Sequence, residues 1–285
     1  MTSKLYVKND GTIHNTEEVY VNENGNWKRA GQIFIKESGD WEPLFSNSGS
    51  ESYTTVGQHN FQVPSGIYSL NVVIQGGGGG GGGGNEGGSG GGGGGGGAGG
   101  NISGSIAVRP YQDLSIVVGG AGAGAPTADR GTLPVPQGTG GGNSQIITPD
   151  ASYVASGGAR GESALTGLAP GMFGAGGAGG STAGPSGPTY TTGSTGSDGS
   201  DNGGDGASQT GGAGASSPNS LGTGGAAGTT GGGDVNTGES AGSDAAGVGA
   251  GGGGAGAKDR DPIVYTFQFW SGGEGTAGKV TLSWS

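Results

Sequence analysis

The chain contains no cysteine among its 285 residues, so neither a disulfide bond nor a thiolate metal site can stabilise it. Only 29% of the residues are hydrophobic, which excludes a large apolar core. Basic residues are also few: 11 Lys and Arg stand against 22 Asp and Glu, giving a formal net charge of -11. Nucleic acids and anionic membranes attract basic surfaces, so we expect neither as a partner.

The sequence also has no apolar run of membrane-spanning length, and its first residues, MTSKLYV, lack the apolar stretch of a secretion signal. We therefore expect a soluble protein that is made in the cytoplasm and does not insert into a membrane.

Motifs that carry chemistry are scarce. Residues 273–279 follow the first seven positions of a phosphate-binding P-loop, but Val280 replaces the Ser or Thr that binds Mg²⁺, and no helix can follow. The two histidines, His14 and His59, each lie in or beside an expected strand. We therefore expect no enzymatic activity and no cofactor.

One acidic cluster is a candidate for binding a cation, because carboxylate oxygens are the ligands that Ca²⁺ prefers. Asp198, Asp201 and Asp205 lie close in sequence but match no calcium-loop spacing. A solvated loop without metal is the favoured interpretation, and a bound cation is the alternative.

Glycine is what the sequence has in abundance, with 79 residues, and residues 76–100 are almost entirely glycine. Ordering a backbone costs roughly 1–2 kcal/mol per residue, and glycine has no side chain whose burial could offset that cost. A polyproline-II-like helix directs its N–H and C=O groups outward, so several such helices can bond to one another. We predict that residues 76–84 and 90–97 are left-handed helices of three residues per turn, buried among similar segments.

Disorder is the alternative for these segments, because glycine-rich sequences without a strict period usually do not fold. Only 12% of the residues are charged, and expected strands flank the glycine region. Both features favour an ordered bundle, with Ala, Ser and Thr confined to its outer faces.

A 14-residue repeat over residues 5–45 predicts three β-hairpins. Apolar triplets recur at 5–7, 19–21 and 33–35. The turn position of each repeat is a glycine: Gly11, Gly25 and Gly39. One position of the following strand is Ile13, Trp27 and Trp41. We expect residues 1–46 to form a module that attaches the protein to a partner. Trp27 and Trp41 would fill the seams between hairpins, with Tyr20 and Phe34 in the triplets. Carbohydrate binding by the two tryptophans is the alternative.

Residues 47–52 are polar and predict a flexible linker. The second domain, residues 53–285, alternates expected strands with glycine segments. We expect strands at 53–56, 58–63, 67–74 and 278–285, a pair formed by 102–108 with 114–118, and a weaker pair formed by 144–147 with 153–155. The predicted fold is mainly β: a small sandwich continued by a bundle of glycine helices, with almost no α-helix.

Several stretches resemble the glycine-rich domain of bacteriophage tail-fibre and other virion proteins. They are residues 61–75 followed by polyglycine, residues 143–146, and residues 272–284. The Gly-x-Trp units at 25–27 and 39–41 are similar to β-modules of phage tail proteins. The architecture most like this one is the polyglycine-II sandwich of tail-fibre tip adhesins, although those lack the N-terminal hairpin repeats.

This resemblance implies a virion protein of the tail, assembled in the host cytoplasm, whose partners are other tail, baseplate or fibre proteins and a bacterial surface receptor, either protein or polysaccharide. A homotrimer is one assembly that it allows. Two alternatives stay open: a purely structural virion or fibre-assembly protein without receptor contact, and an ice-binding protein.

Binding energy concentrates in a few aromatic and other large residues, and most loops of this chain are poor in them. The predicted receptor contacts are Tyr190, Met172, Phe173, Tyr265, Phe267 and Trp270. We expect Tyr190, Tyr265, Phe267 and Trp270 to share one host-contacting end, because loops that join packed helices cluster at common ends. For residues 263–270, a buried strand is the competing interpretation.

Overall fold

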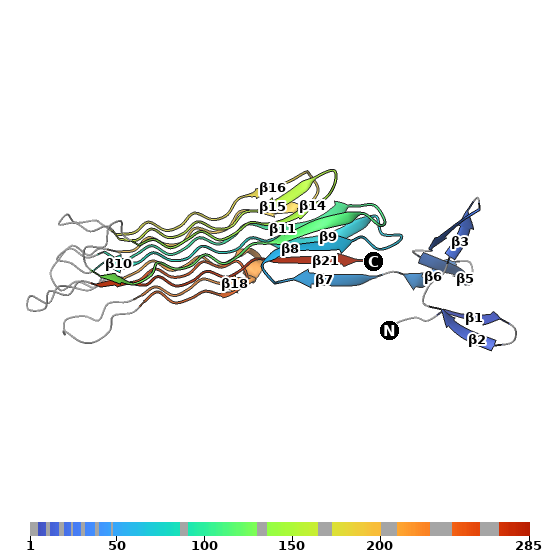
Figure 1. Ribbon diagram of the computed structural model, residues 1–285, viewed down its shortest axis with the longest axis horizontal. Coiled ribbons are helices and arrows are strands. Elements are labelled where there is room, and N and C mark those ends of the chain that lie inside the picture. The colour runs from blue at the N-terminus through green and yellow to red at the C-terminus, as the bar shows by residue number, and fades with distance from the viewer. Residues whose placement is uncertain are drawn as a thin grey trace, which may run out of the picture.

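The structure is a computed structural model, which describes residues 5–9, 12–16, 20–23, 25–29, 32–37, 40–46, 48–85, 91–129, 136–164, 173–200, 210–228, 241–256 and 268–285. Within these residues the regular structure is β-strand apart from one short 3-10 helix, η1 (Pro218–Ser220). The predicted fold class, mainly β, is confirmed. Figure 1 shows a sandwich of strands that continues into a long bundle of nearly parallel chain segments.

The N-terminal repeat folds as three two-stranded antiparallel sheets. They pair β1 (Leu5–Asn9) with β2 (Thr12–Thr16), β3 (Tyr20–Glu23) with β4 (Asn26–Arg29), and β5 (Gln32–Glu37) with β6 (Asp40–Ser46). The pairing register repeats with the sequence, since Ile13, Trp27 and Trp41 lie opposite Lys8, Asn22 and Lys36. Gly25 has a φ of 85°, which a side chain would strain, as the expected turn requires. The seams expected for the tryptophans lie outside the described side chains.

The predicted linker over residues 47–52 is wrong for most of its length. Gly49–Tyr53 form strand β7, which pairs antiparallel with β21 (Lys279–Trp284) at the edge of the sandwich. The polar composition indicated a linker, but an edge strand that lies half in solvent can also carry serines. Ser50 and Ser52 are exposed, and the Ser52 hydroxyl lies 3.1 Å from that of Thr281.

Two five-stranded sheets form the sandwich. The first has the order β17-β11-β9-β21-β7, with β17 (Thr189–Thr191), β11 (Asn101–Ala107) and β9 (Ser69–Gln75). The second has the order β16-β15-β14-β12-β8, with β16 (Thr182–Ala183), β15 (Ser152–Ala155), β14 (Ser144–Ile147), β12 (Asp113–Val118) and β8 (Gly57–Gln62). Neighbouring strands run antiparallel, and their alternating apolar residues line one shared core.

The expected pairing of residues 102–108 with 114–118 is wrong. β11 pairs with β9 and β17 in the first sheet, whereas β12 pairs with β8 and β14 in the second. The connection at 108–112 therefore crosses from one sheet to the other. A short connection suggested a hairpin, but both strands bury apolar side chains, and facing sheets satisfy both. The expected pair of β14 and β15 is confirmed.

The apolar core is small and lies between the sheets. Its members are Tyr53, Phe61, Val63, Ile67, Leu70, Val72, Ile74, Ile102, Ile106, Val108, Leu114, Ile116, Val118, Ile146, Tyr153, Ala155, Val280 and Leu282. No member of this cluster comes from the glycine segments. The bundle must therefore be held by its backbone.

Three glycine segments form the centre of the bundle, and we call them the core segments: 76–84, 92–100 and 249–256. All of their residues are buried. Their hydrogen bonds repeat every third residue: the N–H groups of Gly76, Gly79 and Gly82 donate to one neighbour, segment 92–100, at 2.8–2.9 Å. The intervening N–H groups donate to two other segments. This three-residue period is the one that a polyproline-II helix gives; the left-handed sense stays a prediction.

Each core segment has six hydrogen-bonded neighbours among the described residues. Segment 76–84 donates to 92–100, 139–142 and 272–277, and accepts from 119–125, 157–164 and 249–256. The other two core segments bond to six partners in the same manner, and all three bond to one another. The bundle is therefore a hexagonal array built on a central triangle.

Nine further segments, the ring segments, surround this triangle: 119–125, 139–142, 156–164, 173–181, 193–200, 210–217, 222–228, 241–246 and 271–278. Each is hydrogen-bonded to the next in that order, and the last bonds back to the first through Gly275 N–H and Gly122 O at 2.9 Å. In chain order, two core segments come first. The ring segments follow in sequence, and the third core segment comes between the eighth and the ninth of them.

Close backbone approach requires glycine at most positions of the core segments. A Cβ added at Gly78 would lie 1.9 Å from the carbonyl oxygen of Ala250, and one at Gly94 would lie 2.0 Å from that of Ala175. Ring segments tolerate side chains on one row in three. Gly174, Gly177 and Gly180 are buried, for example, whereas the residue after each of them is exposed. The expected placement of Ala, Ser and Thr on outer faces is thus present in this segment. It is wrong for the core segments, where Ala98, Ala250 and Ala255 are fully buried.

A buried amide network joins the sandwich to the bundle. Asn101 Nδ2 donates to Gln75 Oε1 at 3.0 Å, Gln75 Nε2 donates to Gly99 O at 2.9 Å, and Asn219 Nδ2 donates to Asn101 Oδ1 at 2.9 Å. Gln75 and Asn101 are both fully buried. Gln75 and Asn101 lie where the two-residue period of the strands changes to the three-residue period of the glycine segments. They bond to each other, to Gly99 of a core segment and to Asn219.

Candidate functional site

The end of the bundle remote from the sandwich, which we call the tip, is the candidate functional site (Figure 1). Six chain intervals have both described flanks at this end: 85–91, 129–136, 164–173, 200–210, 228–241 and 256–268. The tip lies eight residues beyond the first core glycine, a distance of about 25 Å at about 3.1 Å per residue.

A small three-stranded sheet forms part of the tip. Its order is β10 (Gly84–Asn85), β20 (Gln268–Trp270) and β13 (Ala128–Asp129), with Gly84 opposite Trp270 and Ala128 opposite Phe269. The three-residue hydrogen-bond period of the bundle thus gives way to strand pairing at its end. This change gives three chain segments a fixed register at the tip.

Ser163 terminates the array beside this sheet. Its hydroxyl accepts from the N–H of Gly83 at 2.9 Å and donates to Pro136 O at 2.6 Å, while its own N–H donates to Gln137 Oε1 at 3.0 Å. The side chain is 2% exposed. Ser163 therefore supplies the acceptor that a further glycine segment would have supplied, so the backbone near the tip is satisfied and fixed.

Two of the predicted contact residues lie at the tip within the described structure. Phe173 is 41% exposed at the start of ring segment 173–181. Trp270 ends β20 and is half-buried, and its indole N–H is buried without a hydrogen-bond partner among the described residues. The segment 173–181 bonds to 92–100 but not to 271–278, so Phe173 and Trp270 lie on different sides of the bundle.

The expectation that Tyr190 shares this end is wrong. Tyr190 lies in β17 opposite Ile102, at the junction of sandwich and bundle, and packs against the apolar core. Its hydroxyl donates to Pro185 O. Burial raises the pKa of Tyr190 above its ordinary value of 10.0. A long aromatic side chain next to a sandwich gains more from covering the core edge than from exposure, so Tyr190 supports the fold instead.

Met172, Tyr265 and Phe267, the remaining predicted contacts, lie outside the described residues. So do Asp201 and Asp205 of the acidic cluster. For residues 263–270, the structure describes only 268–270, which form β20. The hairpin residues Tyr20, Trp27, Phe34 and Trp41 lie in strands whose side chains are not described.

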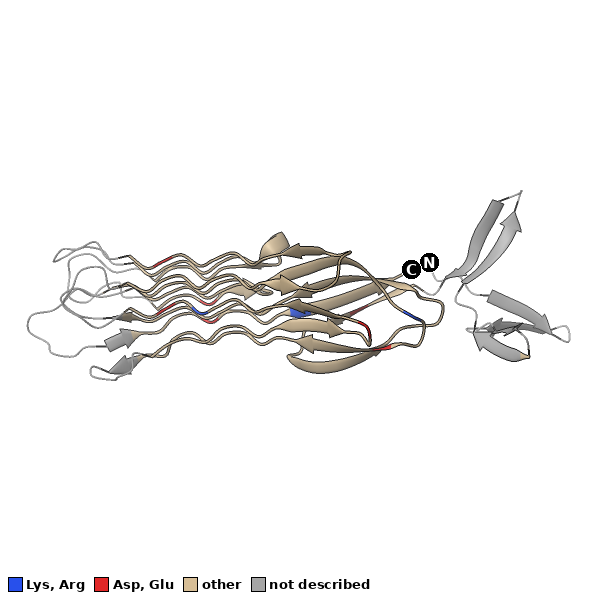
Figure 2. Ribbon diagram, turned by 90° about the horizontal axis from the view of Figure 1, so that it is seen from above, with Lys and Arg blue, Asp and Glu red and all other residues tan. Residues whose placement is uncertain are grey.

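Acidic residues lie along the bundle segments (Figure 2). Two of them accept from backbone N–H groups that face outward from the ring: Asp198 Oδ1 accepts from Gly176 at 2.7 Å, and Asp244 Oδ1 accepts from Glu274 at 2.8 Å. Arg160 and Glu162 form an exposed ion pair at 3.6 Å. Asp198 and Asp244 therefore satisfy backbone N–H groups of the ring segments.

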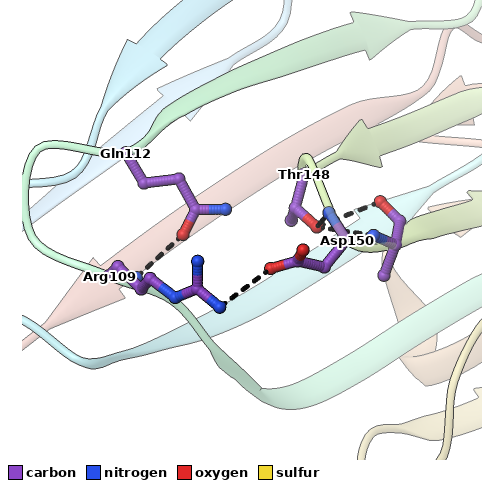
Figure 3. A network of polar contacts seen from close by, with 5 residues as sticks. Arg109, Gln112, Thr148 and Asp150 are labelled. Carbon is purple, nitrogen blue, oxygen red and sulfur yellow. Dashed lines mark hydrogen bonds and ion pairs between the residues drawn. The ribbon is translucent and has the colours of Figure 1, made fainter.

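The end of the sandwich away from the bundle, which we call the base, is formed by the connections at 63–68, 108–112 and 148–151. Figure 3 shows its polar contacts. The Arg109 guanidinium lies 3.6 Å from the Asp150 carboxylate, and the Arg109 N–H donates to Gln112 Oε1 at 2.8 Å. Thr148 Oγ1 accepts from Ala151 N–H at 2.9 Å. These contacts fix the connections, and the ion pair is too exposed to contribute more than about 1 kcal/mol.

The base also exposes two aromatic rings, Tyr68 at 69% and Tyr111 at 56%. Sequence reasoning missed both, together with Ser163 and the junction amides. The junction had a readable signal, because Gln75 and Asn101 directly flank the glycine run. Ser163 had none, since its role depends on segments more than twenty residues away in sequence.

Among the residues that the structure describes, no group of three or more His, Asp or Glu residues could hold a metal ion. No described helix is long and apolar enough to span a membrane.

Comparison with protein families gives a match over most of the chain. The family model of the glycine-rich domain matches residues 54–285, which include both sheets of the sandwich except β7, and the whole bundle. A search of curated proteins found no match to this chain.

Proposed function

The chain belongs to the glycine-rich domain family, and we propose that it is a bacteriophage tail-fibre or tail-tip protein that contacts the host cell surface through the tip. The observation that carries the proposal is the division of the molecule into two ends. The hairpin repeats enter the sandwich through β7, which begins three residues after the last residue of β6, and six chain intervals have their flanks at the opposite end.

The bundle supports this role because it is a fixed spacer between the sandwich and the tip. Core segments bond to six neighbours each, so the tip is held at a fixed distance from the sandwich. The sequence between the flanks of these six intervals can then vary while the array is kept, because the hydrogen bonds that build the array are made by the core and ring segments. A fixed frame with variable connections suits a surface that must recognise a receptor.

The attachment end rests on the hairpin repeats, with Tyr20, Trp27, Phe34 and Trp41 as the residues we propose to contact other tail, baseplate or fibre proteins. The exposed Tyr68 and Tyr111 at the base suit the same side of the assembly. A truncated protein lacking residues 1–46 should fold through its sandwich but fail to be incorporated into virions. Incorporation of the truncated protein would overturn the assignment.

Receptor contact is tested by competition. Purified full chain is incubated with host cells, and adsorption of the corresponding virion is measured afterwards. We expect the chain to block adsorption. We expect Phe173→Ser at the tip, and Phe267→Ser in the interval 256–268, to abolish that block without lowering the unfolding temperature. Tyr68→Ser at the base is the control, because it removes an exposed aromatic ring from the other end.

The same measurements separate the alternatives. A purely structural virion or fibre-assembly protein would be incorporated into particles but would not block adsorption. An ice-binding protein would give thermal hysteresis in solution. Either result in place of adsorption blocking would refute the receptor-binding role.

A further inference from the structure

Strand β7 occupies a mechanical position in the fold. It begins at Gly49, three residues after the last residue of β6, and pairs with β21 over five residue pairs, from Gly49–Trp284 to Tyr53–Val280. It runs from the base towards the bundle (Figure 1). A pull on the hairpins away from the tip therefore acts along β7 and loads its five pairs together.

The rest of the sandwich is joined to the bundle by continuous chain. Strands β9, β12 and β15 run directly into segments 76–84, 119–125 and 156–164, and segments 92–100, 139–142 and 271–278 run directly into β11, β14 and β21. A load applied at the tip is thus shared among many covalent connections at the junction. Between β7 and β21, by contrast, the same load is carried by the few hydrogen bonds of one ladder.

The next strand along the chain cannot replace this ladder. β8 begins at Gly57 beside Val118, at the bundle side of the sandwich, and runs back to Gln62 beside Asp113 at the base. Once β7 is detached, a pull on Gly57 towards the base opens the β8–β12 ladder one pair at a time. Peeling needs less force than shearing, because each pair bears the load alone.

Side-chain packing reinforces β7 at both ends. A Cβ at Gly49 would lie 2.6 Å from the Trp284 ring, so the backbone and the indole are in close contact. The Trp284 ring lies 5.4 Å from that of Phe61 in the second sheet. At the other end, the Tyr53 ring lies 5.1 Å from that of His59. Shearing β7 must break these contacts as well as the ladder.

We propose that β7 is a mechanical clamp, a shear-loaded strand that holds the axial load between the N-terminal hairpins and the tip. The source of such a load rests on the proposed function, since a receptor gripped at the tip would pull against a virion at the hairpins. The clamp itself is a property of the fold. The hairpins differ from it, because their first and last residues pair, as Leu5 does with Thr16, so an axial pull unzips them at low force.

Single-molecule force spectroscopy on the full chain tests the clamp through pulling geometry. One handle is fixed at the N-terminus, and the other is placed at Phe173 on the tip or at Ser285, by incorporating a bio-orthogonal amino acid. Ser285 follows Trp284, which pairs with Gly49, so the second geometry unzips the ladder. We expect a rupture force severalfold higher with the tip handle than with the Ser285 handle. Equal forces in the two geometries would overturn the clamp.

A disulfide staple gives a second, independent test, which the absence of native cysteine makes clean. The Ser52 and Thr281 hydroxyls lie 3.1 Å apart across the ladder, so the S52C/T281C variant can form a disulfide there. In the oxidised variant the disulfide should prevent β7 from separating from β21 under tip loading, so the rupture event assigned to the clamp should disappear. Reduction of the disulfide should restore that event. The matched control is S69C/S105C, whose hydroxyls also meet across two strands of the same sheet, β9 and β11, outside the load path.

The control staple should leave the rupture force unchanged. If it raised the force as much as the S52C/T281C staple, the resistance would belong to the sheet as a whole and the clamp would be wrong. The ranking of forces does not depend on any receptor, so an absence of adsorption blocking would refute the proposed function and leave the clamp standing.

Discussion

The sandwich and the bundle solve the same problem, the satisfaction of a buried backbone, by opposite means. In the sandwich each strand bonds to at most two neighbours in a sheet, and burial of side chains between the sheets stabilises the arrangement. In the bundle each core segment bonds to six neighbours and buries no large side chain. Side chains thus stabilise one region, whereas the other accepts none larger than the methyl groups of Ala98, Ala250 and Ala255 in its core segments. The comparison teaches that the placement of glycine can specify a fold as apolar pattern does.

The largest expected effect comes from adding one methyl group to the bundle. Gly94→Ala places a Cβ 2.0 Å from a backbone oxygen that no flexible side chain can vacate. We expect a loss of about 3 kcal/mol or more in the free energy of unfolding, at the upper end for overpacking, measured by chemical denaturation. Gly120→Ala is the control: its nearest neighbour would be Val56 Cγ1 at 3.6 Å, and we expect a change below about 1 kcal/mol. Equal losses would break the comparison.

The sandwich should show the reverse sensitivity, to removal of side-chain atoms. Ile74→Ala creates a cavity in the core, where Ile74 is fully buried, and should cost about 2–5 kcal/mol in unfolding free energy. The neighbouring Val73→Ala removes atoms from a side chain that is 37% exposed on the outer face, so it should cost much less. Denaturation of both variants under one set of conditions checks the difference. A similar loss for Val73→Ala would show that the core does not carry the sandwich.

The junction between the two regions should depend on its amides. Asn101→Ala leaves the buried Gln75 Oε1 without its donor, and an unsatisfied buried group costs about 1–3 kcal/mol. Asn71→Ala removes an exposed amide from the adjacent strand and should be nearly neutral. Hydrogen exchange sharpens the result: we expect the amide protons of residues 76–79 and 97–100 to lose protection in Asn101→Ala before those nearer the tip. Uniform loss along the bundle would contradict a local role.

The smallest effect expected is a pH dependence confined to the sandwich. Burial raises the pKa of Tyr190 and, more strongly, of Tyr53 above the ordinary value of 10.0. The neutral phenol is therefore favoured in the folded state: the stabilisation is complete below pH 10 and is lost as the pH rises through the folded-state pKa. Stability should fall as the pH rises above about 10, less steeply in Tyr53→Phe. An unchanged slope in that variant would locate the effect elsewhere.

Much of the local structure could be predicted from particular residues. The 14-residue spacing of Ile13, Trp27 and Trp41 gave the hairpin register, and alternation gave β9, β12 and β21. The burial of residues 76–84 followed from the energetic cost of ordering glycine. Pairing between sheets was not predictable from short connections, as the separation of β11 from β12 shows. Of the contact residues predicted for the candidate site, the structure places Phe173 and Trp270 at the tip and Tyr190 at the junction.

What the sequence determined by itself is periodicity: two residues in the strands, three in the glycine segments and fourteen in the hairpin repeat. Periodicity is local because it arises from the backbone conformation of neighbouring residues. The tertiary structure alone decided the neighbours: which three segments form the centre, the closed order of the nine around them, and the side chains such as Ser163 that end the array. A glycine segment offers identical hydrogen-bonding groups on six sides, so only the packing of the whole chain selects among its partners.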